Sequence, residues 1–316
     1  MDWFQKGPQP SDEHERNRYE ARLDKHGDFT LQTFLRGSAP GVKDGPFLSQ
    51  FLLVGNEACN GSYGIDKGRI QYGIQIINQR VCVHKVGVDF MTDWCSWLDV
   101  QKGADVREAE DYESNRRFIT TPRDLATYVH HDALYQAYLN ACLIMLGLEI
   151  PFDKGFPEGK GHPTRDAFAT FGGPHILSLL TEVATRALKA VRRQKFNQHC
   201  RARPEVIGGL LTLYENGHGG KLGKKGEKAI RKLYALLPST LLEYIHEHND
   251  LQKGKARKLT CTGSPPFPIK QDQNGQDQNL LLPMAFPEGS PMHPSYGAGH
   301  ATVAGDGRRA LLLGLL

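Results

Sequence analysis

The chain has 316 residues, a length that allows one large domain or two domains of ordinary size. Hydrophobic residues make up 39% of it, which together with its 34 glycines is typical of a globular protein and excludes intrinsic disorder of most of the chain. The 39 Lys and Arg against 35 Asp and Glu give a formal net charge of +4, a bias too small to predict a nucleic-acid partner.

Membrane spans and a secretory leader are not expected. The longest apolar stretches, 141–148 and 310–316, fall short of the ~20 residues that cross a bilayer. The beginning of the chain, 1–27, is charged throughout, unlike a signal peptide. We therefore expect a soluble protein whose cellular compartment the sequence does not define. Because the 6 cysteines are irregularly spaced, we expect free thiols, and the spacing defines no connectivity if they pair.

The first predicted helix begins at Thr121. Thr121 can cap the helix, Pro122 suits its first position, and Asp124 lies near the positive end of the helix dipole. Apolar and aromatic residues then recur at spacings of three and four up to Leu146, and Gly147 follows. The pattern predicts a single helix over 121–146.

A second helix is predicted from Pro174, where apolar residues recur at steps of three and four up to Val191. Arg192 lies four residues after Leu188, and Lys195 lies four residues after Val191. Both cations therefore continue the stripe that faces the core, where a charge needs a partner.

Later segments predict a mainly helical chain. Residues 226–237 form a predicted helix that ends at Pro238, and Ser239-Thr240 can cap another through Ile245. Residues 252–282 are expected to be a long exposed loop, and 69–77 and 80–88 to pair as strands. These patterns indicate an all-α, bundle-like fold with a single domain over 1–305.

Two segments carry the candidate chemistry, 192–205 with its Arg, Lys and His side chains and 287–300 with its Pro, Gly and His residues. The first offers fixed positive charge, and the second offers backbone N–H groups ahead of a helix start near Ala301. Together they predict a pocket for a tetrahedral oxyanion such as phosphate or vanadate. The alternative is that the basic run is a solvated helix end and the histidines lie on the surface.

The motifs also carry a family resemblance. Lys195, seven residues, Arg203-Pro204, and then HPSYGxGHATVAG over His293–Gly305 resemble the algal-type vanadium-dependent bromoperoxidases, distant relatives of type 2 phosphatidic acid phosphatases and bacterial acid phosphatases. Segments 41–53, 117–146 and 171–176 are similar to the family as well. The resemblance implies the helical bundle of the vanadium haloperoxidase and acid phosphatase type.

The resemblance also implies a role for each matched residue. Lys195 and Arg203 would bind vanadate oxygens, and Gly299 would donate its backbone N–H. His300 matches the histidine that hydrogen-bonds the apical oxygen and acts as acid and base, while His293 and Arg192 match the halide side of the pocket. His293 is thus a second catalytic candidate. The implied reaction is oxidation of bromide by hydrogen peroxide to a hypobromous-acid equivalent, which brominates an organic nucleophile.

The chain departs from the family pattern in its last part. Ala298 stands where the family usually has serine, so one hydroxyl contact to the oxyanion is missing. The family has a further arginine and the histidine that ligates vanadium some tens of residues later, whereas this chain has no histidine after His300. We therefore expect the direct vanadium ligand not to be present in this chain. Gly305 and Gly307 are expected to interrupt a helix, which makes 306–316 an aberrant tail of a chain that is shortened or frameshifted and incomplete at both ends.

Two functions follow from these expectations. The first is a vanadium-dependent bromoperoxidase whose activity is impaired, with hydrogen peroxide, bromide and an organic nucleophile as partners and a homo-oligomeric assembly implied by the resemblance. The second is a non-catalytic oxyanion-binding remnant or assembly subunit, and phosphomonoester hydrolysis ranks after both. Calcium is possible by resemblance, but residues 155–166 are too poor in acidic groups to assign a site.

Overall fold

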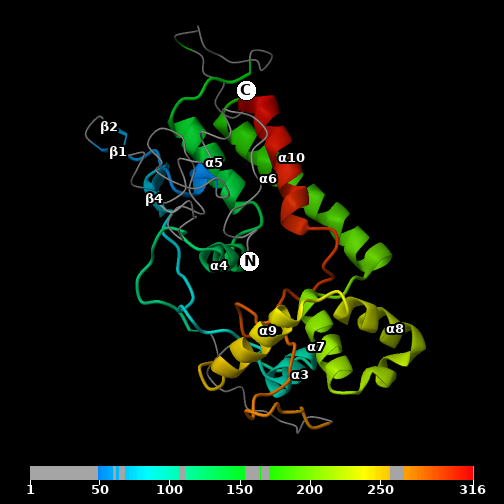
Figure 1. The fold of residues 1–316 in the computed structure, drawn as a ribbon. Coiled ribbons are helices and arrows are strands. Elements are labelled where there is room, and N and C mark those ends of the chain that lie inside the picture. Colours follow the sequence, from blue (N-terminus) through cyan, green and yellow to red (C-terminus); the bar gives the residue numbers. More distant parts are fainter. Residues whose placement is uncertain are drawn as a thin grey trace, which may run out of the picture. The chain divides into compact units, whose positions relative to one another are not determined.

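The computed structural model describes residues 49–59, 62–63, 68–106, 111–153, 164, 171–256 and 267–315 (Figure 1). These residues belong to two compact units, each described by itself below. Unit 1 comprises the described parts of Met1–Val83, Glu113–Arg193 and Gly297–Leu316, and unit 2 those of His84–Tyr112 and Gln194–Tyr296.

Helices dominate unit 1. They are α4 (Pro122–His131), α5 (Gln136–Gly147), α6 (Gly173–Arg193), α10 (Gly299–Leu315) and the short 3-10 helix η1 (Gln50–Leu52). Helices α5, α6 and α10 contact one another and lie side by side in Figure 1. The all-α class expected from the sequence is therefore confirmed for this part of the chain.

The predicted helix over 121–146 is two helices. Thr121 and Asp124 form the expected capping box at the start of α4, with the Asp124 N–H donating to Thr121 Oγ1 over 3.1 Å. Asp132, however, has an extended backbone (φ −67°, ψ 150°), which ends α4, and α5 begins four residues later at Gln136. The single-helix prediction was wrong because the apolar spacing runs on across this break.

Helix α6 confirms the second predicted helix. Its buried stripe, with steps of three and four, consists of Ile176, Leu180, Ala184, Ala187 and Val191. Ala184 and Ala187 pack with Val303 of α10.

Helix α10 runs through Gly305 and Gly307, so the predicted interruption was wrong. Gly307 is buried, and a Cβ atom there would lie 3.4 Å from the Tyr138 ring. Close packing against this ring offsets the low helix propensity of glycine. The division into a domain over 1–305 and a tail over 306–316 stays a prediction.

The strands of unit 1 are short. They are β1 (Ala58–Cys59), β2 (Ser62–Tyr63), β3 (Arg69–Tyr72) and β4 (Gln75–Asn78). β3 pairs antiparallel with β4, with Ile70 opposite Ile77. The predicted pairing of 69–77 with 80–88 was wrong because the chain already turns back at Gly73, where φ is +59°. In 80–88 only Val81 and His84 form isolated bridges, to Arg117 and Tyr112 respectively.

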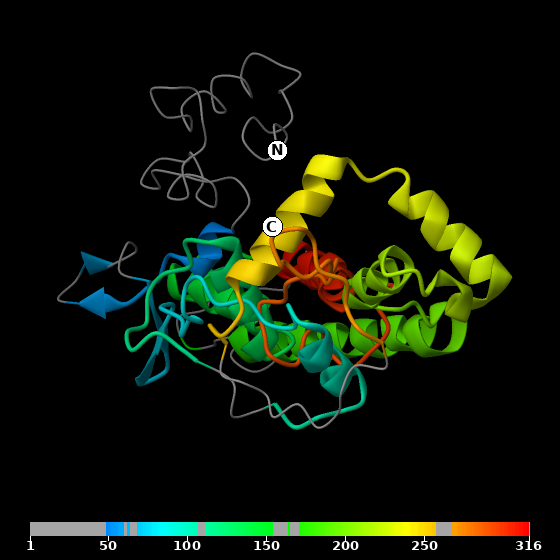
Figure 2. The ribbon, with the colours of Figure 1, turned by 60° about the horizontal axis from the view of Figure 1, so that its bottom comes forward.

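Unit 2 contains helices on either side of the candidate loop. They are α3 (Trp94–Gln101), the π-helical segment η4 (Gln194–His199), α7 (Pro204–Glu215), the 3-10 helix η5 (Gly219–Leu222), α8 (Gly223–Tyr234) and α9 (Ser239–Leu251). Figure 2 shows α8 and α9 in yellow, joined by a short connection. Both were predicted, although α8 begins and ends three residues earlier than the predicted 226–237, and Pro238 rather than Ser239 occupies the N-cap position of α9.

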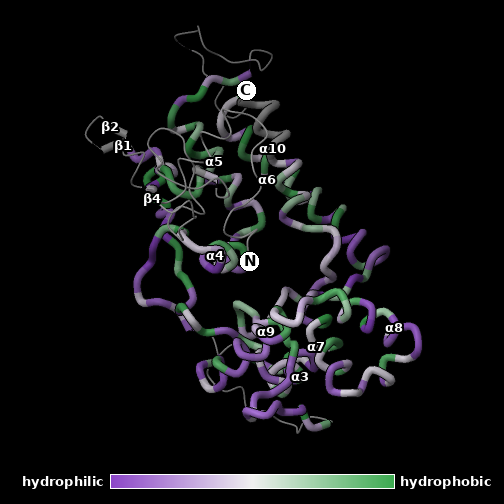
Figure 3. Tube along the Cα trace, viewed as in Figure 1, coloured by the Kyte–Doolittle hydropathy of each residue, from purple (hydrophilic) through white to green (hydrophobic). Residues whose placement is uncertain are grey.

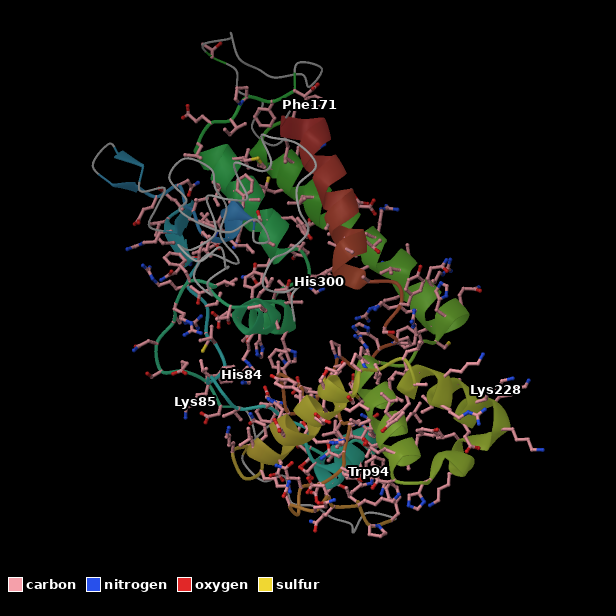
Figure 4. All side chains as sticks on the ribbon, viewed as in Figure 1. His84, Lys85, Trp94, Phe171, Lys228 and His300 are labelled. Atoms are coloured by element: carbon pink, nitrogen blue, oxygen red, sulfur yellow. The ribbon has the colours of Figure 1, made fainter. Side chains whose placement is uncertain are left out.

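The close approach of α3 to α7 was not predicted, and it fixes the start of α7. The Trp97 indole Nε1 donates to the Glu205 carbonyl over 3.0 Å. A Cβ atom on Gly209 would lie 2.3 Å from the Trp97 ring, so only glycine allows this contact. Trp94 and Trp97 belong to one core cluster, and Trp94 is labelled in Figure 4.

The loop expected to be exposed over 252–282 is partly buried. Phe267, Asn279, Leu280 and Leu281 are all buried. Leu280 packs with Leu211 of α7, and the Leu280 N–H donates to Thr212 Oγ1 over 2.9 Å. The prediction of exposure was wrong for these residues because Leu280 packs on α7, Phe267 and Leu281 pack with the tryptophans of α3, and Asn279 bonds Asn249 of α9, contacts that polar neighbours in the sequence do not reveal.

Two further expectations concern cysteines and membranes. Cys82, Cys142 and Cys200 are free thiols, whereas Cys95 takes part in a disulfide, contrary to the expectation of free thiols. Linear spacing missed it because it does not report which cysteines meet in space. Within the described ranges, no helix is both long and apolar enough to cross a membrane.

Candidate functional site

Lys195 is a buried cation in the π-helical segment that follows α6. Only 3% of the residue is exposed. Its Nζ donates to the Pro294 carbonyl over 2.9 Å and lies 3.1 Å from His293 Nδ1. The sequence prediction that Lys195 continues the core-facing stripe and needs a partner is confirmed.

Arg203 reaches the same histidine from the start of α7. It occupies the N-cap position, and Pro204 is the first residue of the helix. Its Nε donates to the His293 carbonyl over 2.7 Å, and its Nη2 donates to His293 Nδ1 over 2.7 Å. Burial lowers the pKa of the guanidinium and the nearby Glu205 carboxylate opposes this, so Arg203 remains charged at neutral pH.

These contacts define the tautomer of His293. Lysine and arginine side chains have donors and no acceptor, so His293 Nδ1 must accept from both. The neutral tautomer with its proton on Nε2 satisfies these two contacts, and Nδ1 also lies 3.3 Å from the Pro294 carbonyl. Lys195, Arg203 and His293 form what we call the cation cluster.

The loop that carries His293 is attached to α7 through a buried carboxylate. Glu205 is 4% exposed and accepts from the Ser290 N–H over 3.2 Å and from Ser290 Oγ over 2.8 Å. Gly289, the residue directly before Ser290, has φ +75°. A Cβ atom on Gly289 would lie 2.6 Å from the sulfur of Met91. Only glycine therefore fits the turn that brings Ser290 to Glu205.

A second attachment lies just after His293. The Ser295 N–H donates to the Arg201 carbonyl over 2.9 Å, and Ser295 Oγ donates to the Ala202 carbonyl over 2.9 Å. The loop is thus held on both sides of His293, which pre-organises the cation cluster. Glu205, Ser290 and Ser295 lie within the two candidate segments, but the sequence pattern predicts no role for them.

His300 lies in unit 1, in the first turn of α10 (Figure 4). Its Nε2 is 3.0 Å from Asp132 Oδ2 and 3.2 Å from Oδ1, so Nε2 donates to the carboxylate. The His300 side chain is 47% exposed and the Asp132 side chain only 6%. We call these two residues the histidine–aspartate pair.

Asp132 is the residue that sequence reasoning missed most clearly. It was placed inside a continuous helix, whereas it ends α4. Burial and then the Asp132 charge raise the pKa values of Tyr128 and Tyr138, so both phenols stay protonated beside the carboxylate. The one available signal was an acidic residue directly after two histidines at a helix end.

Gly299 and Arg192 also lie in unit 1. Gly299 is the first residue of α10, where N–H groups lack a partner within the helix. Arg192 is exposed, so the prediction that it continues the buried stripe was wrong. Arg192 lies four residues after Leu188 on the same side of α6. Leu188 is already only half-buried, so this side of the helix faces solvent by Arg192.

The structure thus brings the predicted residues together in two groups. Lys195, Arg203 and His293 meet in unit 2, and His300 meets Asp132 in unit 1, which also contains Arg192 and Gly299. Each group is a property of its own unit.

The donor set of the cation cluster fits an anion. Lysine and arginine offer only N–H donors, and Arg203 has donors beyond the two that His293 accepts. Within the described ranges, no group of three or more His, Cys, Asp or Glu residues could hold a metal ion. The donors of the cation cluster fit an oxyanion such as vanadate, held through hydrogen bonds.

Comparison with known proteins gives matches along most of the chain. No family model matches. The chain is 44% identical to the vanadium-dependent bromoperoxidases of Corallina officinalis over 295 residues and of Corallina pilulifera over 297 residues, covering 89% of this chain and 46% of each relative. It is 30% identical to the vanadium-dependent bromoperoxidase of Ascophyllum nodosum, over 87% of this chain and 42% of that protein.

A solved structure of a vanadate-dependent bromoperoxidase has a similar fold. The homohexameric second vanadate-dependent bromoperoxidase of Ascophyllum nodosum matches with a TM-score of 0.59 and 23% identity, over 92% of this chain and 41% of that chain. The resemblance predicted from the motifs is confirmed, and so is the helical haloperoxidase fold. The chain spans about half the length of the curated relatives that it matches.

Proposed function

We propose that this chain binds vanadate and contributes to a vanadium-dependent bromoperoxidase. The observation that carries the proposal is the convergence of two cationic side chains, Lys195 and Arg203, on His293. The 44% identity to two vanadium-dependent bromoperoxidases supports the choice of oxyanion.

Lys195 and Arg203 would hold the negative charge of the oxyanion. Lys195 supplies a point charge with three donors, and Arg203 a planar fork. Because Lys195 is buried, its charge is poorly screened by solvent and attracts an anion strongly. Their bonds to His293 hold both cations in place before an anion arrives.

His293 would act on the halide side of the site. Two cationic donors contact its Nδ1, so we assign proton transfer to its other ring nitrogen, Nε2. A neutral ring beside two fixed cations leaves the positive field intact for an anionic halide. Arg192 is a further candidate for the halide side, and its exposure fits a residue that meets bromide from solvent.

His300 would handle protons, with Gly299 donating its backbone N–H to the oxyanion. Asp132 accepts from His300 Nε2 and so holds a proton on that nitrogen. Asp132 is thus a positioning residue for His300.

Bound vanadate would supply a Lewis acid that activates hydrogen peroxide for the oxidation of bromide to a hypobromous-acid equivalent. An organic nucleophile would then take up the bromine. We further propose a homo-oligomeric assembly, since the solved relative is a homohexamer. We propose no site for calcium.

Vanadate binding tests the proposal directly. Equilibrium dialysis of the chain with orthovanadate should show saturable binding that Lys195→Met weakens by at least about 10-fold, because a hydrogen bond to a charged group is worth about 1.5 to 3 kcal/mol. Lys189→Met is the matched control, since Lys189 is an exposed lysine on α6. Equal binding by both variants would refute the role of Lys195.

Turnover is tested on the same preparations. Bromination of monochlorodimedone with vanadate, bromide and peroxide should depend on vanadate and fall in Lys195→Met. Vanadate binding without any turnover would instead support the non-catalytic oxyanion-binding protein.

A further inference from the structure

The exposed face of α8 carries a stripe of positive charge in unit 2. Six exposed cations share it and define what we call the basic stripe: Lys221 at the end of η5, and Lys224, Lys225, Lys228, Arg231 and Lys232 on α8. Figure 3 shows α8 as largely hydrophilic, and Figure 4 shows Lys228 on its outer side.

The spacing places these cations on one side of the helix. The five on α8 stand at i, i+1, i+4, i+7 and i+8, which places them on one side of that helix, whereas Lys221 precedes the turn at Gly223, where φ is +69°. The opposite face, with Leu222, Ile230 and Leu233, packs into the core with Leu211 of α7. At 1.5 Å per residue the part of the basic stripe on α8, from Lys224 to Lys232, is about 12 Å long.

Acidic residues do not neutralise the basic stripe. In the part of the chain that the structure describes, none of its cations forms an ion pair, and Lys221 alone has an aromatic neighbour, 5.6 Å from the Phe267 ring centre. Glu227 is the one acidic residue of α8 and is half-buried. The stripe is therefore a concentrated charge on a chain whose net charge is only +4.

This arrangement destabilises the free helix. Lys224 and Lys225 lie in the first turn of α8, which has no acidic residue and no side-chain cap. Cations at this end oppose the helix dipole and cost about 0.3 to 1 kcal/mol each. Like charges at i+3 and i+4, such as Lys224 and Lys228, cost about 0.2 to 0.5 kcal/mol a pair. An anionic partner would relieve both costs.

We propose that the basic stripe binds a linear anionic polysaccharide that carries sulfate or carboxylate groups. A row of charges about 12 Å long on α8, with Lys221 before its start, suits a ligand with regularly spaced anions. Five of the six cations are lysines, which act as point charges and suit dispersed anions rather than bidentate recognition.

Other polyanions fit less well. Proteins that bind single-stranded nucleic acid commonly add aromatic side chains that stack on bases, and among the described residues of α8 the one aromatic side chain, Tyr234, is half-buried and bonded to Glu215. Helices that lie in a membrane surface insert large apolar side chains, and none of those described on α8 is exposed. A polysaccharide needs neither.

Binding to heparin, used as a sulfated polysaccharide probe, tests the proposal on the full chain. The variant Lys224→Gln/Lys228→Gln/Lys232→Gln should bind heparin at least about 10-fold more weakly at low salt. The slope of log affinity against log salt concentration should become shallower by roughly 2, since each neutralised anion contributes about 0.7 to 0.9. Its melting temperature should be unchanged or higher, because repulsion within α8 is reduced.

The control is a second triple variant with the same net charge as the first. Lys102→Gln/Lys189→Gln/Lys255→Gln removes three exposed lysines elsewhere and should change the heparin affinity by less than about 3-fold. Equal weakening in both triple variants would overturn the proposal, as would the absence of heparin binding. Tighter binding to duplex DNA or to phosphatidylserine vesicles than to heparin, at equal anion concentration, would also overturn it.

Discussion

The cation cluster and the histidine–aspartate pair achieve order in different ways. Lys195 is buried and bonds His293 together with Arg203, whose loop is held by Glu205 and Ser290. His300 is half exposed and its side chain bonds Asp132. The comparison teaches that the first group is built to hold a fixed charge, while the second is open to exchange protons with solvent.

The largest expected effect comes from removing the support of the cation cluster. Glu205→Ala leaves the Ser290 N–H and hydroxyl without their acceptor and removes the carboxylate beside Arg203. We expect the free energy of unfolding to fall by about 3 kcal/mol, as for a broken buried charge network. Urea denaturation measures it. Glu247→Ala, at an exposed position on α9, should change stability by less than about 0.5 kcal/mol, and an equal loss in both would contradict the supporting role.

Replacing the fork of Arg203 tests charge against geometry. Arg203→Lys keeps the positive charge but loses the paired contacts to the His293 carbonyl and Nδ1. Vanadate affinity, measured by equilibrium dialysis, should fall by about 10-fold with little change in melting temperature. The matched control is Arg201→Lys, at an exposed arginine of the same segment. Unchanged affinity in Arg203→Lys would mean that charge alone suffices.

Unit 1 also contains a carboxylate that several hydrogen bonds hold in place, that of Asp124. The Arg117 Nη2 donates to Asp124 Oδ1 over 2.8 Å, and the Thr120 N–H and hydroxyl donate to Oδ2 over 3.1 Å each. Burial alone would raise the pKa of Asp124, but these bonds outweigh it and lower the pKa below 3.8.

The sign of the pH dependence follows from that lowered pKa. The contribution of Asp124 is fully present above its unfolded pKa and is lost as the pH falls through the lower folded value. Asp124→Asn should cost about 1 kcal/mol at neutral pH, and its melting temperature should fall less than that of the parent chain below about pH 4. Thermal denaturation from pH 7 to 3 measures both. If the melting temperatures of the two proteins changed with pH in parallel, protonation of Asp124 would not be coupled to folding.

Sequence periodicity predicted what depends on local spacing. The stripe of α6 and the burial of Lys195 follow from steps of three and four, and the start of α4 follows from its capping residues. The motif around His293 also predicted that Lys195, Arg203 and His293 act together. Each of these features is set within a few residues or by a family pattern.

What the sequence did not predict depends on contacts between distant segments. The break at Asp132 lies inside a continuous apolar pattern, and its carboxylate meets His300 only in the fold. Glu205 holds a loop that lies 85 residues away in the chain. Gly307 lies within α10 against the Tyr138 ring, a contact that no local propensity includes.

The smallest expected effect on stability concerns the histidine–aspartate pair. Asp132→Ala removes the acceptor that holds the proton on His300 Nε2, but His300 is half exposed, so stability should fall by less than about 1 kcal/mol. The effect should instead be seen in the imidazole itself, where ¹⁵N chemical shifts report the tautomer. We expect a shift from the Nε2–H form toward a mixture in Asp132→Ala, while His293 keeps its Nε2–H form. Lys195 and Arg203 both donate to His293 Nδ1. A mixture of tautomers at His293 in the parent chain would therefore contradict the difference between the cation cluster and the histidine–aspartate pair.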